Sequence, residues 1–440
     1  MSGCPIPEAQ PETGLKLLRG LARDRSLLTA MEIMHADVGP AFRITLPGFR
    51  PAVLVGPESM RAVMVSQQAH FRWRSPSDPV TGLLRHGVLV EDGAEHDRLR
   101  ALMEPPLHKP HALRQIPVMQ AQTDRVLDGW ADGSTQDMLV EMRQVALLVF
   151  MAALLDVEFA PDMARLWSPI LRAIKYISPG LWIIWPGMPR FGYQQSLKQL
   201  DDYLYGIIRD RRQRVAATAP DDDTTDLLTA LVRAPGMSDD LIRDQILTML
   251  IAGHDTSTAL LAWVLHLFGT HPDVLARAQA EVDAELGSEP LTTAALARLT
   301  YLDMVIKETL RLYPPIHVGN RIAADDMTIN GYELQAGDRV MASIYLTQRD
   351  EHHWDEPRAF RPERFAPGER HPAFTYVPFG AGPRTCIGAA FAQIEAKVVL
   401  GRILQQFTLA GEGRQVRPYM GATLEPHPGV FLRVRRRHQS

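Results

Sequence analysis

The chain has 440 residues, of which 46% are hydrophobic and 22% are charged, so it can form a large buried core. Its formal net charge of -4 gives no electrostatic reason to expect a nucleic acid as a partner. The only two cysteines, Cys4 and Cys386, cannot build a disulfide framework, which excludes the small disulfide-rich folds and favours a reducing compartment.

The apolar segments bear on membrane association. Residues 1–28 combine three prolines with mixed charge and have no apolar core long enough for a signal peptide or an anchor. The run 145–155 is too short to cross a bilayer, and the run 248–268 carries His254 and Asp255 near its start. We therefore expect core helices, no membrane anchor and a cytoplasmic protein.

The first part of the chain predicts a small sheet. The β-like runs 42–46 and 52–55 flank a Pro-Gly pair, which predicts a hairpin, and a short helix is expected over 58–66. Residues 71–93 read as irregular, with apolar side chains that are more typical of a loop capping a core than of a ligand site. A helix is then expected to begin near Asp92.

That helix places His96 and Arg100 on one face, because they are four residues apart. By itself the pair is typical of a solvated surface. Residues 116–158 follow with an amphipathic helical pattern and no chemical motif.

The stretch 167–193 interrupts helix with an apolar loop that is punctuated by Pro and Gly. Its centre is Trp182, Ile183, Ile184 and Trp185. An exposed apolar patch indicates contact with a partner, a membrane or an oily ligand. The linker 219–226, which holds four aspartates, predicts a solvated turn between helices.

A helix of about thirty residues, roughly 45 Å long, is predicted from Ser238 as N-cap to Phe268. Its middle, Ala252-Gly-His-Asp-Thr-Ser-Thr, concentrates poor helix formers, and the Thr256 hydroxyl can donate back to the carbonyl of Ala252. Asp255 has two readings: it can face water, or it can be a costly buried acid that is retained for use.

The stretch Phe379–Gly388 reads Phe-Gly-Ala-Gly-Pro-Arg-Thr-Cys-Ile-Gly and precedes an apolar helical run over 389–407. Cys386 therefore lies where a loop becomes a helix, and the helix dipole and Arg384 are expected to favour its thiolate. The glycines permit a tight loop, and Gly388 allows close approach of something flat and bulky. Taken alone, Cys386 could be a small buried hydrophobe.

This loop matches Phe-Gly-x-Gly-x-Arg-x-Cys-x-Gly at every fixed position and resembles the heme-binding loop of the cytochrome P450 family. The resemblance implies heme b as cofactor, with Cys386 as the axial thiolate ligand of iron. It further implies that Arg384 holds a heme propionate, that Phe379 shields the sulfur and that Gly388 contacts the cofactor.

Other motifs resemble family elements in the family's order. His96 and Arg100 are similar to the residues that contact a propionate from the helix near Asp92, and Arg321 matches the arginine that reaches the second propionate. For Arg321, a charged strand end is the alternative.

The segment around Ala252 resembles the family's oxygen-activating motif, with Ser257 in the place often held by a second threonine. The resemblance implies that Ala252 lies against the cofactor, that Thr256 hydrogen-bonds dioxygen and that Asp255 relays protons to it.

A helix predicted over 293–312 contains Glu308 and Arg311, a spacing that is common in ordinary surface pairs. By resemblance, these residues join Arg364 in a Glu-Arg-Arg network. We expect this network to hold the cysteine loop and to have no catalytic role.

The resemblance runs from about His96 to Gly388. It implies a mainly α fold with small β-sheets, in which heme lies between the long central helix and the helix after the cysteine loop. We expect a partly flexible N-terminal segment at 1–30 and a single heme-thiolate monooxygenase domain at 31–440.

The implied activity is monooxygenation by hydroxylation or epoxidation, with O2 and with electrons from a ferredoxin or flavodoxin-type carrier and its NAD(P)H reductase. Lys397 and Arg402, together with Arg98 and Lys109, could offer that carrier a basic patch. A peroxide-driven peroxygenase and a non-catalytic heme sensor are the alternatives, and neither explains the acid-alcohol pair.

The substrate is expected to be a hydrophobic small molecule, since by family position 71–93 roofs its pocket and 182–185 borders its entrance. Arg72, Arg74 and Arg85 could hold a fatty carboxylate, whereas a terpenoid or a polyketide fits the apolar pattern equally well. The basic cluster 433–438 is predicted to be a solvated tail.

Overall fold

The computed structural model describes residues 3–24, 26–179, 192–217 and 226–437. Its helices are α1 (Pro11–Asp24), α2 (Leu27–Val38), α3 (Pro57–Arg61), α4 (Pro79–Leu84), α5 (Gly93–Met103), α6 (Lys109–Arg114), α7 (Ile116–Leu127), α8 (Met138–Val149), α9 (Met163–Ile177), α10 (Tyr193–Ala217), α11 (Leu227–Arg233), α12 (Asp239–Thr270), α13 (Pro272–Glu285), α14 (Thr293–Arg298), α15 (Thr300–Leu312), α16 (Ile344–Thr347) and α17 (Ala389–Gln406).

The strands are short and form four small sheets within the described residues. They are β1 (Cys4–Pro5), β2 (Ala41–Arg43), β3 (Ala52–Leu54), β4 (Phe71–Arg72), β5 (Thr135–Asp137), β6 (Val318–Ala323), β7 (Met327–Ile329), β8 (Tyr332–Leu334), β9 (Arg339–Ser343), β10 (Phe407–Gly411), β11 (Arg417–Met420), β12 (Leu424–His427) and β13 (Phe431–Arg436). The predicted mainly α fold with small sheets is confirmed.

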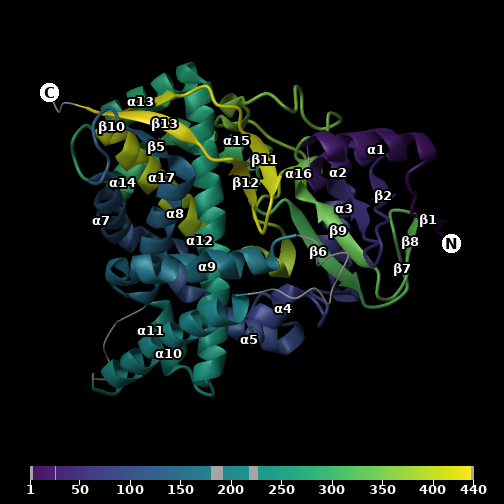
Figure 1. Cartoon of the computed structure of the whole chain (residues 1–440), viewed down its shortest axis with the longest axis horizontal. Helices are drawn as coiled ribbons and strands as arrows, with labels where there is room; N and C mark the ends of the chain where they lie inside the picture. The colour runs from purple at the N-terminus through teal and green to yellow at the C-terminus, as the bar shows by residue number, and fades with distance from the viewer. Residues whose placement is uncertain (1–2, 25, 180–191, 218–225, 438–440) are drawn as a thin grey trace.

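Helix α12 has 32 residues and runs through the whole helical part of the molecule (Figure 1). The Ser238 hydroxyl caps it by accepting from the backbone N–H of Leu241, and Asp239 and Asp240 lie in the first turn, where the helix dipole favours negative charge. Most of its side chains are buried, and it packs against α8, α10, α15 and α17. The predicted long core helix is confirmed.

The largest sheet has the strand order β2-β3-β9-β6-β4 and lies on the side of the molecule that holds α1 and α2 (Figure 1). Strands β2 and β3 form the predicted antiparallel hairpin, with Ala41 opposite Leu54. Strand β3 then pairs in parallel with β9, a contact between segments almost 300 residues apart. Residues of β6 and β9, such as Arg321 and Met341, line the interior cavity, so this sheet forms one of its sides.

The predicted continuous helix over 293–312 is wrong. Helix α14 ends at Arg298, and Leu299 has φ -71 and ψ 70, outside the helical region. Helix α15 then begins under the carboxylate of Glu281, which accepts from the backbone N–H of Tyr301 at 2.6 Å and of Leu302 at 2.9 Å. Glu281 on α13 therefore caps the N-terminus of α15. The residue at this N-terminus in the sequence, Leu299, has no polar side chain that could cap the helix, so the local sequence does not predict its start.

The predicted solvated tail at 433–438 is also wrong for the residues that the structure describes. Strand β13 pairs with β10 on one side and with β5 on the other. Arg437, just beyond it, binds Asp283 at 2.7 Å. The alternating basic residues therefore form the outward face of a sheet strand whose Leu432 and Val434 are buried.

Several other expectations are adjusted. The segment 71–93, read as irregular, contains β4 and α4, and the helix over 58–66 continues from α3 into a π-helical turn at Ala62–Ser66. The apolar residues 182–185 and most of the linker 219–226 lie outside the described residues. Asp226 is buried and not solvated, because it caps α11 and pairs with Arg211.

Among the described helices, none is by itself long and apolar enough to cross a membrane. Helices α12 and α13 meet that length and composition only when joined, and the chain bends by 112° between them. The runs 145–155 and 248–268 are largely buried in the core, as predicted.

Candidate functional site

All ten site residues named from the sequence line one cavity of about 990 Å³. They come from α5, α12, β6 and the loop before α17: His96, Arg100, Ala252, Asp255, Thr256, Arg321, Phe379, Arg384, Cys386 and Gly388. The rest of the lining is mostly apolar and includes Phe150, Leu260 and Phe391. Elements far apart in the sequence therefore converge on one interior space.

The cysteine loop has a tightly determined shape. Gly380 and Gly382 adopt φ +72 and +70, and a 3₁₀ turn spans Gly382–Arg384. The backbone N–H of Cys386 donates to the carbonyl of Phe379 at 2.9 Å, which closes the loop. Cys386 is exposed toward the cavity, three residues before α17 begins.

The electrostatics of Cys386 differ from the expectation. Burial raises the pKa of its thiol, and the backbone N–H of Gly388 and the charge of Arg100 only partly oppose that effect. Arg384, which we expected to favour the thiolate, binds Asp92 at 2.6 Å instead. The loop by itself therefore does not favour the thiolate, and the expected contribution of Arg384 is not among the causes that act on Cys386.

The cations of the site gather around one aromatic ring. The guanidinium carbons of Arg321 and Arg384 lie 3.6 and 5.1 Å from the ring centroid of Trp73. Within the described residues, the one hydrogen bond of Arg321 goes to the carbonyl of Asn320. Burial, then the charges of Arg74 and Arg384, lower the pKa of Arg321 to about 9. The Trp73 Nε1 donor is buried without a partner in the described residues.

Arg100 and His96 approach the same region from α5. Arg100 donates to the carbonyl of Thr385 at 2.8 Å, and His96 is buried with its Nδ1 2.8 Å from Asp97. The face of α5 that carries His96 and Arg100 thus borders the interior cavity and is not a solvated surface. Orphaned donors and clustered cations beside a cysteine fit a flat cofactor that carries an iron and two carboxylates.

Thr256 donates to the carbonyl of Ala252 at 2.6 Å, as the sequence predicted. Asp255 is buried, accepts from the Thr423 hydroxyl at 2.8 Å and lies 3.6 Å from Arg143, which also pairs with Glu425. Burial, and next the charge of Glu425, raise the pKa of Asp255 to about 7. The water-facing reading of Asp255 is therefore wrong, and its carboxyl can exchange a proton near neutral pH.

Sequence reasoning missed a second buried acid in the cavity wall. Glu395, on α17, accepts from the Ser257 hydroxyl at 2.6 Å, and burial raises the pKa of its carboxyl to about 8. A lone acid in the apolar run 389–407 was the available signal. The partners of Asp255 on α8 and β12, Arg143 and Glu425, carried no such signal.

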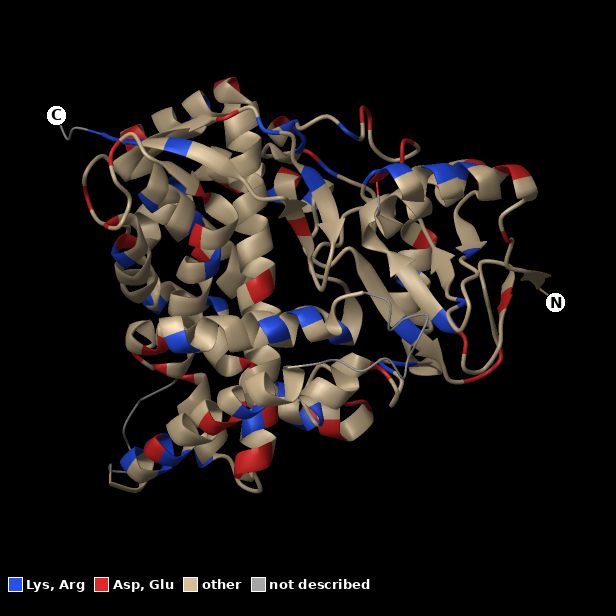
Figure 2. Cartoon of the chain, in the orientation of Figure 1, with Lys and Arg blue, Asp and Glu red and all other residues tan. Residues whose placement is uncertain are grey.

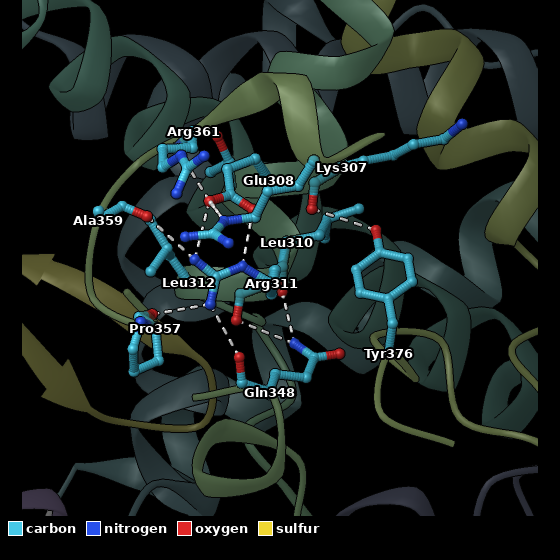
Figure 3. Close-up of polar contacts among 12 residues, drawn as sticks. Lys307, Glu308, Leu310, Arg311, Leu312, Gln348, Pro357, Ala359, Arg361 and Tyr376 are labelled. Carbon is cyan, nitrogen blue, oxygen red and sulfur yellow. Dashed lines mark hydrogen bonds and ion pairs between the residues drawn. The ribbon is translucent and has the colours of Figure 1, made fainter. Parts of the chain in front are cut away.

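The Glu-Arg-Arg network forms as predicted (Figure 3). Glu308 is fully buried and accepts from Arg311 at 2.7 and 2.8 Å, while the Nε of Arg364 lies 3.3 Å away. Arg311 also donates to the carbonyls of Gln348, Pro357 and Ala359. These bonds join α15 to the loop that leads toward the cysteine.

The expected basic patch is not a set of unpaired cations. Lys397 binds Asp303 at 2.9 Å and Arg402 binds Asp124 at 2.9 Å, and their side chains are only 16% and 15% exposed. Arg98 pairs with Glu95. Figure 2 shows acidic and basic residues interleaved over the helices, so the patch interpretation is wrong for Lys397 and Arg402.

The family model described as Cytochrome P450 matches residues 5–433 of this chain. A putative cytochrome P450 139 of Mycobacterium tuberculosis is 30% identical over 426 residues, covering 90% of this chain and 95% of that protein. Cytochrome P450 4V2 of Mus musculus is 34% identical over 315 residues, covering 64% of this chain and 58% of that protein. The crystal structure of the cytochrome P450DA heme domain superposes with a TM-score of 0.86 at 26% identity, covering 100% and 99% of the two chains.

The chain belongs to the cytochrome P450 family. It is a heme-thiolate monooxygenase that uses heme b, O2, an organic substrate and a redox partner.

Proposed function

We propose that the protein inserts one oxygen atom of O2 into a C–H bond or an alkene of a hydrophobic small molecule. Two electrons come from a ferredoxin or flavodoxin-type carrier and its NAD(P)H reductase. In balanced form, substrate, O2, NAD(P)H and a proton yield the oxygenated product, water and NAD(P)⁺. The convergence of the cysteine loop and the Asp255-Thr256 pair on one mostly apolar cavity supports this reaction best.

In this proposal the Cys386 sulfur holds the heme iron, and Phe379 shields that sulfur. Arg321, Arg384 and the α5 pair His96 and Arg100 hold the propionates through charge-assisted hydrogen bonds. Ala252 and Gly388 contact the macrocycle. When bound, heme b supplies the activation of O2 and the transfer of one oxygen atom to the substrate.

Asp255 and Thr256 supply protons to that chemistry. A carboxyl with a pKa of about 7 is well matched to proton transfer at neutral pH. Asp255 exchanges protons through Glu425, whose side chain is 20% exposed while Asp255 is only 1% exposed, and Arg143 holds the two carboxyl groups together. Thr256 lines the cavity, and its hydroxyl oxygen, whose proton goes to the carbonyl of Ala252, would accept a hydrogen bond from a polar group held there.

We also infer a single domain over 31–440, a partly flexible segment at 1–30 and a cytoplasmic location. The two cysteines, Cys4 and Cys386, are both free, which suits a reducing compartment. A peroxide-driven peroxygenase and a heme sensor remain the competing functions, and the buried Asp255-Thr256 pair speaks against both.

The deciding experiment compares electron sources with the purified holoenzyme and a panel of hydrophobic compounds. We expect oxygenated product with NAD(P)H, a ferredoxin system and O2, and little or none with hydrogen peroxide alone. Product with peroxide alone would establish the peroxygenase instead. Ligand binding without product under either condition would establish the sensor.

A further inference from the structure

Trp73 follows β4 directly, and its side chain lines the same cavity as Cys386. Its Nε1–H is buried and has no hydrogen-bond partner in the part of the chain that the structure describes. A buried indole donor without an acceptor is unfavourable, so we expect an acceptor from outside the chain to meet it. The motifs that resemble the family assign no role to this residue.

The groups that surround the indole are cations, which cannot accept its hydrogen bond. The guanidinium carbons of Arg321 and Arg384 lie 3.6 and 5.1 Å from the ring centroid. The charge of Arg74, the next residue, is the strongest of those that act on Arg321. Asp92 is already engaged, because it accepts from the Trp73 backbone N–H at 3.1 Å and from Arg384 at 2.6 Å. The acceptor is therefore expected to be an anion, which would also offset the charge of these arginines.

A second tryptophan shares the local features of Trp73 and differs in its place in the fold. Trp354 is 3% exposed, its Nε1–H also lacks a partner within the described residues, and the guanidinium carbon of Arg311 lies 4.9 Å from its ring centroid. Arg311 is neutralised by the buried Glu308, however, and Trp354 is not among the described residues that line the cavity. Only Trp73 of these two tryptophans can therefore meet a ligand in the cavity.

We propose that Trp73 is a further cofactor-binding residue, whose Nε1–H donates a hydrogen bond to a propionate carboxylate of heme b and whose ring holds Arg321 beside that carboxylate. The indole is neutral, so it binds the carboxylate without adding another charge to the arginines around it. The chain continues from Trp73 into α4, whose residues also line the cavity, so the same bond joins a wall of the substrate cavity to the cofactor.

The test measures the rate of heme transfer from the purified holoenzyme to apomyoglobin, for Trp73→Phe and for Trp354→Phe as the matched control. Phenylalanine keeps an aromatic ring and removes the Nε1–H, so Trp73→Phe should release heme roughly ten- to hundredfold faster than the wild type. Trp354→Phe should release heme at the wild-type rate. The carbon monoxide spectrum, which reports the sulfur ligand of the iron, should be unchanged in both variants.

Reconstitution with the dimethyl ester of heme b identifies the group that Trp73 contacts. The ester lacks the carboxylate charge, so the difference in heme release between Trp73→Phe and the wild type should largely disappear. A difference that persists with the ester would show that Trp73 acts through packing alone and would overturn the proposal. If Trp73→Phe is isolated without heme, titration of the apoprotein with heme replaces the transfer rate, and a Kd raised by the same factor is expected.

Heme release from Trp73→Phe at the wild-type rate would also overturn the proposal. A changed Kd for hydrophobic substrates in that case would assign the Nε1–H donor to the substrate, and an unchanged Kd would assign it to a water molecule. Each of these results would leave the monooxygenase function intact, because that function rests on Cys386 and on the Asp255-Thr256 pair.

Discussion

The hydroxyls of Thr256 and Thr258 make the same type of hydrogen bond within α12, but the two side chains lie in different surroundings. Their hydroxyls donate to the carbonyls of Ala252 and His254, four residues earlier, at 2.6 and 2.8 Å. Thr256 lines the cavity, whereas Thr258 is fully buried in the core. Comparing substitutions at these two threonines therefore distinguishes a chemical role of the hydroxyl in the cavity from its effect on the stability of α12.

Thr256→Ala is expected to slow product formation on the order of 10²-fold, because the hydroxyl that we propose as a polar contact inside the cavity is removed. Reducing equivalents should then appear as hydrogen peroxide, so the ratio of product to NAD(P)H consumed falls. Thr258→Ala should lower the melting temperature but leave that ratio unchanged. An equal loss of coupling in both variants would show that Thr256 acts only through the helix.

At the scale of the element, the cysteine loop depends on a backbone that only glycine permits. Gly382 has φ +70, and an added Cβ would clash with the backbone carbonyl oxygen of Met64. Gly413 has nearly the same φ, +68, but an added Cβ would meet nothing within 4 Å. At either position, a residue with a side chain would be held in a strained backbone conformation that costs about 1–3 kcal/mol. Only at Gly382 would the added Cβ also clash with a neighbouring atom.

Gly382→Ala is therefore expected to displace the loop and to reduce the heme content of the purified protein severalfold. Gly413→Ala should cost about 1–3 kcal/mol in the free energy of unfolding with heme content unchanged. Urea denaturation and the ratio of heme to protein measure the two effects. Full heme incorporation by Gly382→Ala would mean that the loop shape does not control cofactor binding.

At the scale of the whole molecule, Glu308 and Arg311 on α15 join two other segments (Figure 3). Arg311 donates to the carbonyls of Pro357 and Ala359, and Glu308 accepts from Arg364 in the 3₁₀ turn Pro362–Phe365. Glu308 and Arg311 are fully buried, so each neutralises the other where water cannot. The nearby pair of Glu363 and Arg277 is 51% and 58% exposed and is screened by solvent.

Glu308→Gln should lower the free energy of unfolding by about 3–5 kcal/mol, because Arg311 is left as a buried charge without a counterion. Glu363→Gln should change it by about 0–1 kcal/mol. Denaturant midpoints of the two variants provide the comparison. Equal midpoints would contradict a structural role for the Glu308 network.

The sequence by itself determined the features that depend on neighbouring residues. The cysteine loop, the cap and length of α12, and the bond from Thr256 to Ala252 all follow from local backbone chemistry. The fold class was implied by the resemblance of these motifs, in this order, to the cytochrome P450 family. These patterns act over a few residues, so they can be read before the chain is folded.

Only the tertiary structure decided the partners. Asp255 meets Thr423 across 168 residues, Ser257 meets Glu395 across 138, and Glu281 starts α15 from another helix. The basic C-terminal segment became a strand because β10 and β5 offered it hydrogen bonds on both sides. Burial then set the proton affinities of Asp255, Glu395 and Cys386, since desolvation depends on the surrounding fold and not on residue type.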